Sequence, residues 1–424
     1  MPKIGDGLDA VTAFAGAAAA GMSLFLPFTF GDESAIDSPY RVTSLINSVP
    51  RAAALGLIVA VVVAVLARPI TRPGLIWLTA TGGASALTAN YFIGEAMTST
   101  NVLTTQNYID SMFGGVLFGA LCICAWRARW SAVGFGLGVV VVFVYGEVVA
   151  VFTSNAAATA DKSAHTPFWL VAAAMVLLAV NTVRHQHGIM LPVVPRMAAD
   201  LPITPIIAAT VVSLSLLIAT EWLGREFDER NGRFWQIAVA VIATLVAAFV
   251  AAVLLPGRDG TGVLLAVSVA AAGDSLADAP RFGWHLFVVL AVGIVAILAG
   301  LRWSAPWGVL LGAAAICAFA AVAQHLPSSF AWTAGVVLLT CVVGFAIGST
   351  RVTYLPSAML GLGALFLPSI LWSIPTERRH WPTGGTAVGE QVPGQVALVI
   401  TVGAAAGLAV LYQLRPLVPR VAHS

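Results

Sequence analysis

The chain has 424 residues, of which 59% are hydrophobic and only 9% are charged, and its formal net charge is +2. Soluble domains carry about 25% charged residues, so this composition excludes a water-soluble protein and predicts an integral membrane protein. The basic residues stand singly between apolar runs, which excludes a phosphate-binding patch for nucleic acid.

Fourteen segments are long and apolar enough to count as membrane-spanning helices, because a helix needs about 20 apolar residues to cross the hydrocarbon core. Several segments are separated by only a few residues, so neighbours in sequence must form antiparallel pairs. We therefore expect an all-α, polytopic transmembrane helix bundle. In chain order the expected spans are 9–28, 51–68, 74–93, 110–126, 131–153, 167–183, 204–222, 234–255, 261–277, 283–301, 304–324, 329–348, 352–373 and 395–414.

The Arg and Lys residues of the loops indicate the orientation, because cytoplasmic loops are enriched in them. With the N-terminus inside, every cytoplasmic loop between the expected spans holds at least one Arg, whereas two of the outer loops hold none. The sequence thus predicts a multi-pass protein of the cell membrane with both termini in the cytoplasm. Lys occurs only at positions 3 and 162, a bias typical of GC-rich bacterial genomes, so we expect a bacterial source.

An internal repeat follows the fourth and the tenth expected spans. Arg129-Trp130-Ser131-Ala132 recurs as Arg302-Trp303-Ser304-Ala305, and each copy leads into a helix that contains glycines. The match predicts two six-helix halves of the same orientation. The expected organisation is a first half at 1–183, a cytoplasmic linker at 184–203, a second half at 204–348, and two additional C-terminal helices with a tail at 349–424.

Two short basic turns occupy corresponding places in these halves. Thr71-Arg72-Pro73-Gly74 and Asp259-Gly260-Thr261-Gly262 resemble degenerate copies of the Asp-Arg-x-Gly turn of the major facilitator superfamily. The first copy lacks the Asp and the second lacks the Arg. The resemblance implies a transporter of two six-helix halves, with Arg72, Gly74, Arg258, Asp259 and Gly262 in cytoplasmic gating turns.

Two carboxylates fall inside apolar runs, where an ionisable side chain is costly and therefore points to function. Glu147 and Asp274 are the expected proton-coupling or substrate-binding residues. Two other interpretations stay open: Glu147 reaches the outer interface, or Asp274 begins an outer loop after a break at Gly273.

No cofactor or metal site is expected from the His and Cys residues. No two histidines fall on one helical face, and the four cysteines lie in apolar runs, where they act as small buried hydrophobes.

The transport hypothesis is alternating access of the two halves, driven by protons, because no G-x-x-x-x-G-K-[ST] phosphate loop is present. The expected cargo is a small amphipathic or neutral solute, and the expected partners are the lipid bilayer and that unidentified small molecule. We expect no enzymatic activity. Two alternatives remain: a non-catalytic membrane subunit of an envelope or secretion complex with membrane-protein partners, and a polyprenyl-sugar-dependent membrane glycosyltransferase, for which Asp32, Glu33 and Asp37 would supply an acidic outer loop.

Overall fold

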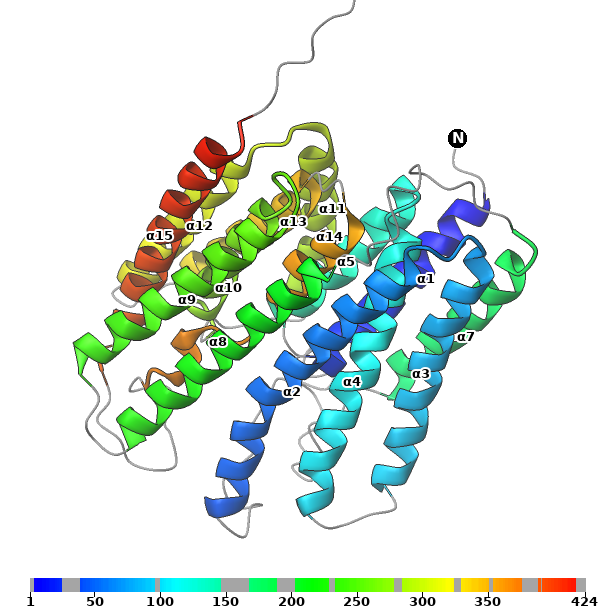
Figure 1. Cartoon of the computed structure of the whole chain (residues 1–424), viewed down its shortest axis with the longest axis horizontal. Coiled ribbons are helices and arrows are strands. Elements are labelled where there is room, and N and C mark those ends of the chain that lie inside the picture. The colour runs from blue at the N-terminus through cyan, green and yellow to red at the C-terminus, as the bar shows by residue number, and fades with distance from the viewer. Residues whose placement is uncertain are drawn as a thin grey trace, which may run out of the picture.

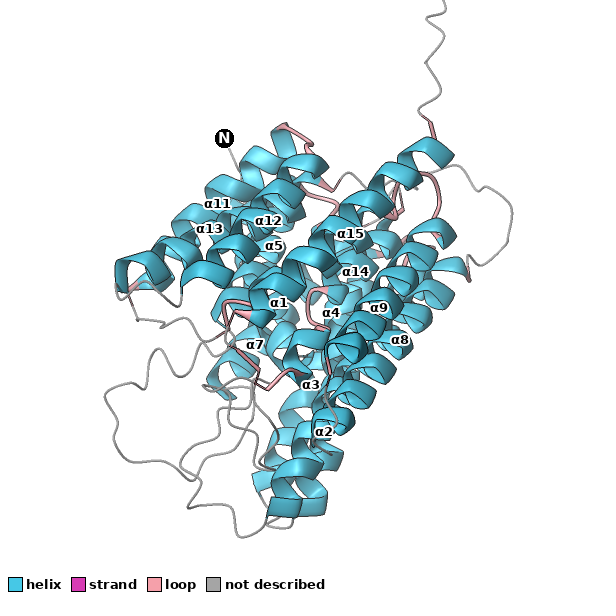
Figure 2. Cartoon of the chain, turned by 90° about the vertical axis from the view of Figure 1, so that its left-hand side faces the viewer, coloured by secondary structure: helices cyan, strands magenta, loops and turns pink. Residues whose placement is uncertain are grey.

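The structure is a computed structural model that describes most of the chain. The described residues are 4–24, 39–95, 100–145, 168–188, 203–228, 233–277, 284–323, 329–350, 354–375, 388–389 and 391–416. Helices joined by short loops make up these residues (Figure 2). The all-α fold expected from the sequence is therefore confirmed.

Each of the fourteen expected spans overlaps one described α-helix, and the thirteenth span also includes a short 3₁₀ helix, η2. The helices are α1 (Ile4–Leu24), α2 (Pro39–Ala67), α3 (Pro73–Glu95), α4 (Thr100–Ala125), α5 (Arg129–Tyr145), α7 (Phe168–His185), α8 (Thr204–Asp228), α9 (Phe234–Leu254), α10 (Thr261–Asp274), α11 (His285–Arg302), α12 (Pro306–Ala323), α13 (Ser329–Ser349), α14 (Leu355–Ala364), η2 (Ile370–Ser373) and α15 (Val392–Leu414).

Nine helices of the described residues are long and apolar enough to cross a bilayer, and four others are apolar but shorter. The two shortest are α10 and α14, with 14 and 10 residues. After Ala364 the backbone of the thirteenth span leaves the helix, and it resumes as η2 at Ile370. Pro368 contributes to this break, because proline disfavours helical backbone at the residue before it and has no N–H. Irregular backbone at this depth is tolerated only where protein surrounds it, and the segment from Leu365 to Ile370 is buried.

The first six helices form one packed set. In this set α2 lies along α4, α1 lies along α5, α4 and α7, and α3 packs between α4 and α7. Glycines permit the closest of these contacts: a Cβ at Gly115 or Gly119 of α4 would collide with the α2 backbone at Gly56 and Ala60. Small residues at a helix interface let two backbones approach in this way.

The last six helices repeat this pattern of neighbours. Helix α11 lies along α13, α10 packs on α14 and α15, and α12 packs between α13 and α15. Gly300, Gly344 and Gly348 bring α11 and α13 together, in the same way that glycines join α2 and α4. Each helix of the first set therefore has a counterpart in the second. In order, α1, α2, α3, α4, α5 and α7 correspond to α10, α11, α12, α13, α14 and α15.

This packing groups the helices differently from the expected division into 204–348 and 349–424. Helices α14 and α15 are not appended to a finished half, because they pack on α10 and α12 inside it. The additional pair is instead α8 and α9, which lies between the two sets in the chain. Helix α8 packs on α2 of the first set and on η2 and α14 of the second, as Figure 1 shows for α2 and α8.

The two sets meet along α2 with α14 and along α5 with α11 and α13. Under the helix matching above, the α2–α14 and α5–α11 contacts are equivalent to each other. Phe366, in the break after α14, inserts into the first set: its ring lies 5.6 Å from that of Phe118 in an edge-to-face arrangement and against Gly21 of α1. We call the end of the bundle at which α1 begins the near end, and the opposite end the far end.

Candidate functional site

Asp274 is the last residue of α10, and its carboxylate serves a neighbouring segment. Asp274 Oδ2 accepts a hydrogen bond of 3.0 Å from the backbone N–H of Ser369, the residue that precedes η2. The first N–H groups of a helix have no partner within the helix and favour a negative charge. Asp274 therefore supports the broken thirteenth span.

Asp259 makes the equivalent contact at the near end of the same two segments. Its side chain is 3% exposed, and Oδ2 accepts a hydrogen bond of 2.9 Å from the backbone N–H of Tyr354, which precedes α14. Asp259 and Asp274 are thus each 95 residues before their partners. The two carboxylates hold α10 and the segment from α14 to η2 parallel and in register.

The other residues of this turn also act within the second set. Arg258 Nε donates to the Arg415 carbonyl at 3.0 Å, and its guanidinium carbon lies 4.2 Å from the centroid of the Tyr412 ring. Gly262 faces Gly361 of α14, so that α10 and α14 approach closely. Arg258, Asp259 and Gly262 therefore tie the start of α10 to α14 and α15.

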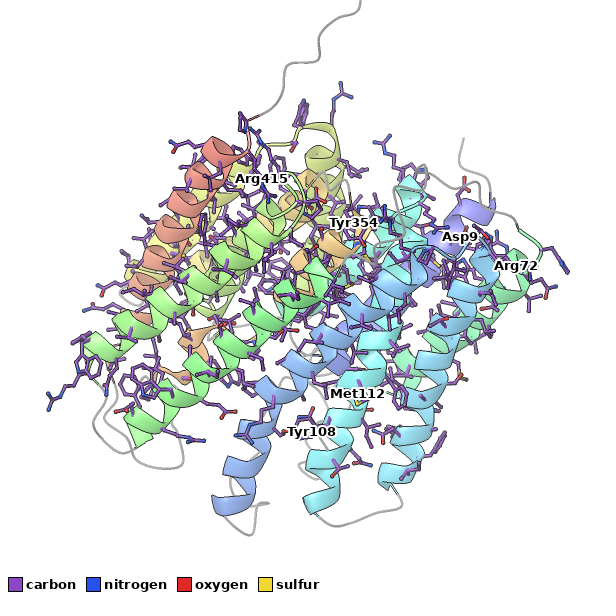
Figure 3. All side chains as sticks on the ribbon, viewed as in Figure 1. Asp9, Arg72, Tyr108, Met112, Tyr354 and Arg415 are labelled. Atoms are coloured by element: carbon purple, nitrogen blue, oxygen red, sulfur yellow. The ribbon has the colours of Figure 1, made fainter. Side chains whose placement is uncertain are left out.

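The corresponding turn of the first set holds Arg72 and Gly74. Arg72 is exposed at the near end, where Figure 3 labels it. Gly74 is buried, and a Cβ there would lie 2.7 Å from Gln186 Cα, which follows α7. At the near end, Arg68 rather than Arg72 contacts the second set: its guanidinium carbon lies 4.2 Å from the centroid of the Tyr354 ring. A gating role for the two turns stays a prediction.

Several other expected residues fall outside the part of the chain that the structure describes. Glu147 is one of them, and so are the acidic residues Asp32, Glu33 and Asp37 of the glycosyltransferase alternative. Their proposed roles stay predictions.

A buried carboxylate that the sequence reading did not single out lies in α4. The helix begins at Thr100, so Asp110 lies about 15 Å along it rather than at its start. Asn90 of α3 donates its side-chain N–H to Asp110 Oδ1 at 2.8 Å and to the Gln106 carbonyl at 3.3 Å. Asp110 is 7% exposed, and none of the ion pairs among the described residues includes it.

Two further hydrogen bonds join α4 to α1 and α2 within one turn of Asp110. Asn107 of α4 donates to Ser48 Oγ of α2 at 2.9 Å, and Ser111 Oγ donates to the Ser23 carbonyl of α1 at 3.2 Å. Because helical residues three or four apart share a face, Gln106 stands over Asp110 and Asn107 over Ser111. We refer to this group as the α4 polar cluster: Ser23, Ser48, Asn90, Gln106, Asn107, Asp110 and Ser111.

Gln106 differs from the rest of the cluster. It is 3% exposed, and neither its side-chain nitrogen nor its side-chain oxygen has a hydrogen-bond partner in the described structure. A buried amide without partners costs about 1–3 kcal/mol for the group left unsatisfied. Such a group in a native interior calls for a reason, and a functional role is one.

The basic side chain nearest in sequence to Ser48 is already paired. Arg51 of α2 makes two hydrogen bonds to Glu221 of α8, at 2.5 Å and 2.9 Å, and Tyr108 of α4 lies near this pair. Figure 3 labels Tyr108 in the far half of α4. Arg51 is therefore engaged by Glu221, and the cluster keeps a carboxylate without a cation.

Among the described residues, no set of three His, Cys, Asp or Glu side chains lies close enough to hold a metal ion. Cys122, Cys124 and Cys317 are buried free thiols in apolar surroundings. Among the described histidines, His285 is buried and bonds to Thr333 at 3.2 Å.

No protein-family model and no curated protein matches the chain. Solved structures align with it over nearly its whole length. The human organic anion transporter MFSD10 (TETRAN) is 12% identical, with 97% of this chain and 100% of that chain covered and a TM-score of 0.49. A POT family transporter in complex with a thioalcohol-conjugated peptide is 14% identical, with 96% of each chain covered and a TM-score of 0.49. The nucleoside transporter NupG is 11% identical, with 97% and 99% covered and a TM-score of 0.36.

All three of these structures are transporters. TM-scores below 0.5 do not define a helix-by-helix correspondence, and identities of 11–14% carry no information on the substrate.

Proposed function

We propose that the protein is a secondary transporter that carries a small amphipathic solute by alternating access between its two six-helix sets. The observation that carries the proposal is the matched packing of the two sets, which meet through the equivalent contacts α2–α14 and α5–α11. Transporters built from two repeats move one repeat against the other around a central site. The contacts between the sets are the surfaces at which such a movement would occur.

Proton coupling requires a carboxylate inside the bundle that can gain and lose a proton. Asp110 meets this requirement, because it is buried in the first set and no Arg or Lys pairs with it among the described residues. Asp274 fits less well, since the backbone N–H of Ser369 already uses its carboxylate. We assign proton coupling to Asp110 and keep Glu147 as the second candidate.

The test uses purified protein in liposomes that contain a pH-sensitive dye. Small amphipathic solutes are added one at a time, and both solute uptake and the internal pH are followed. Asp110→Asn should abolish proton movement linked to any solute that the unmodified protein carries. Asp274→Asn is the matched control, because the amide oxygen of Asn still accepts the Ser369 N–H.

Two results would overturn the assignment. Normal proton movement in Asp110→Asn, with loss in Asp274→Asn or Glu147→Gln, would place the coupling elsewhere. If the unmodified protein moves none of the solutes, the transport proposal itself is refuted.

A further inference from the structure

From the α4 polar cluster we infer a binding site for the ammonium group of a small organic cation, which competes with a proton for Asp110. The inference rests on the proposed function and deepens it by naming the chemical class of the solute. It depends on three observations: the charge of the cluster, its free hydrogen-bonding atoms, and its apolar surroundings.

The charge of the cluster selects for a cation. Asp110 is its only ionisable member, and a buried carboxylate is stabilised by a positive partner. An anionic ligand would meet this carboxylate with no Arg or Lys in the cluster to offset it. A neutral ligand would leave the carboxylate uncompensated. A cationic ligand is the one class that pairs with it.

Two acceptor oxygens left free in the cluster fit an ammonium group, which has three donors and no acceptor. Asn90 is the one described side chain that bonds to the Asp110 carboxylate, and it bonds to Oδ1, which leaves Oδ2 for a ligand. The buried carbonyl oxygen of the Gln106 side chain has no partner either. Both acceptors belong to one face of α4, because these residues are four apart.

We infer that the rest of the solute is hydrocarbon, because buried apolar residues flank members of the cluster along their own helices. Leu24 follows Ser23 at the end of α1, and Leu87 lies one turn before Asn90 in α3; both are buried. An organic cation with one ammonium group and an apolar body matches this combination, and it agrees with the amphipathic solute expected from the sequence.

Other charged or titratable groups on the elements packed against α4 do not replace the ligand. Among the side chains that the structure describes on α2 and α4, these are Arg51, which Glu221 pairs, Tyr108, and the buried thiols of Cys122 and Cys124. Tyr91 lies next to Asn90 on α3 and stacks on Phe168. The remaining groups among the described side chains are Asp6 and Asp9 at the near end of α1, Arg129 and Tyr145 at the two ends of α5, and Tyr354 before α14.

The proton and the ammonium ion compete for the Asp110 carboxylate, so binding of one releases the other. When an ammonium ion binds to protonated Asp110, the carboxyl O–H bond breaks, the proton leaves to solvent, and the carboxylate pairs with the ammonium group. One proton is released for each ammonium ion bound. A transporter with this site exchanges the organic cation for a proton.

The experiment measures binding to the purified full-length chain in detergent and needs no transport. Phenethylammonium chloride is compared with the neutral 2-phenylethanol and with sodium chloride, by thermal unfolding and by a pH indicator in weakly buffered solution. We expect phenethylammonium alone to raise the Tm and to release protons. Asp110→Asn should remove both effects, whereas Asp9→Asn, at the near end of the same helix set, should keep them.

Gln106→Leu is the second variant, because it separates a binding role from a structural one. Leu has a similar volume and removes the two unpartnered polar atoms, so the ligand-free variant should have a Tm equal to or above that of the unmodified protein. Its Tm shift with phenethylammonium should fall at least severalfold.

An equal Tm shift with 2-phenylethanol, a shift with sodium alone, or an unchanged shift in a folded Asp110→Asn or Gln106→Leu variant would overturn the inference. So would the absence of any shift with phenethylammonium. If phenethylammonium binds as expected but no solute crosses liposome membranes, the site stands and the transport proposal fails.

Discussion

Phe366 offers the most direct test of how the two helix sets fit together. Its side chain is 3% exposed and lies in the break after α14, against Gly21 and the ring of Phe118 in the first set. Phe118 is eight residues after Asp110, which places Phe118 about 12 Å further along α4 toward the near end, and the Phe366 ring lies beside the Phe118 ring. The ring therefore lies between the α4 polar cluster and the near end of the bundle.

Replacing Phe366 by Ala removes this ring. Truncation of a well-packed Phe to Ala costs about 3–5 kcal/mol of unfolding free energy, and the upper half of this range applies where the backbone cannot close the space. The break is held by the Asp274–Ser369 hydrogen bond, and Gly363 packs on Leu57, so collapse around the site is restricted. We expect a loss of about 4 kcal/mol, and a smaller loss for Phe366→Leu, which keeps most of the buried carbon atoms.

The assay is thermal unfolding in detergent, together with proton leakage into liposomes in the absence of solute. Phe366→Ala should unfold at a lower temperature and leak faster than the unmodified protein, with Phe366→Leu in between. A Phe366→Ala variant with the same Tm and the same rate of proton leakage as the unmodified protein would refute the placement of this ring between the sets.

Three further predictions use the same unfolding assay. Asp259→Ala removes the acceptor of the N–H that begins α14 and should lower the unfolding free energy by about 1–2 kcal/mol. Asp259→Asn keeps an acceptor oxygen and should lose much less stability, so equal losses in both variants would argue against a cap. Gly119→Ala should cost about 1–3 kcal/mol, because its Cβ collides with the α2 backbone. Gly82→Ala, which meets open space, should gain up to about 1 kcal/mol, so a gain at both glycines would contradict the packing. Glu221→Gln should cost no more than about 1 kcal/mol, because the Arg51 side chain is 44% exposed; a double-mutant cycle with Arg51→Met measures this coupling.

The positions of the helices could be predicted from the sequence because hydropathy reports directly on lipid exposure. The prediction placed the start of the fourth span at residue 110, whereas α4 begins at Thr100. The cause is the polar run Gln106-Asn107-Tyr108-Ile109-Asp110-Ser111, which lowers the local hydropathy although Asn90 and Ser48 satisfy part of it inside the bundle. Spacing within this run, with Gln106 and Asp110 four apart, was the signal that could have identified a buried polar face.

The grouping of the helices was harder to predict, because it depends on contacts between distant segments. The repeated Arg-Trp-Ser-Ala lies at the start of α5 in one copy and between α11 and α12 in the other, which are not matching positions in the packing. Arg and Trp are both favoured at the ends of membrane helices, so a four-residue match there does not require a repeat. The glycines of α2, α4, α11 and α13 carry the information on packing instead.

The site residues show the same limit. The sequence singles out Asp274 as a carboxylate in an apolar run and Asp259 as part of a short turn. Their partners are backbone N–H groups 95 residues away, which no local pattern reveals. The environment of a carboxylate depends on which segment it meets, and this becomes visible only in the fold.

The α8–α9 pair has a consequence for how the chain is made in the membrane. Helix α8 is synthesised after α2, on which it packs, and before η2 and α14, its partners in the second set. It holds to the first set through the Arg51–Glu221 pair and to η2 through the 2.8 Å hydrogen bond from Ser373 Oγ to the Thr220 carbonyl. We expect fragments 1–188 and 203–424, expressed separately in one cell, to find each other through α8. During biosynthesis the first set would then fold first, α8 would pack on it, and the second set would assemble on α8.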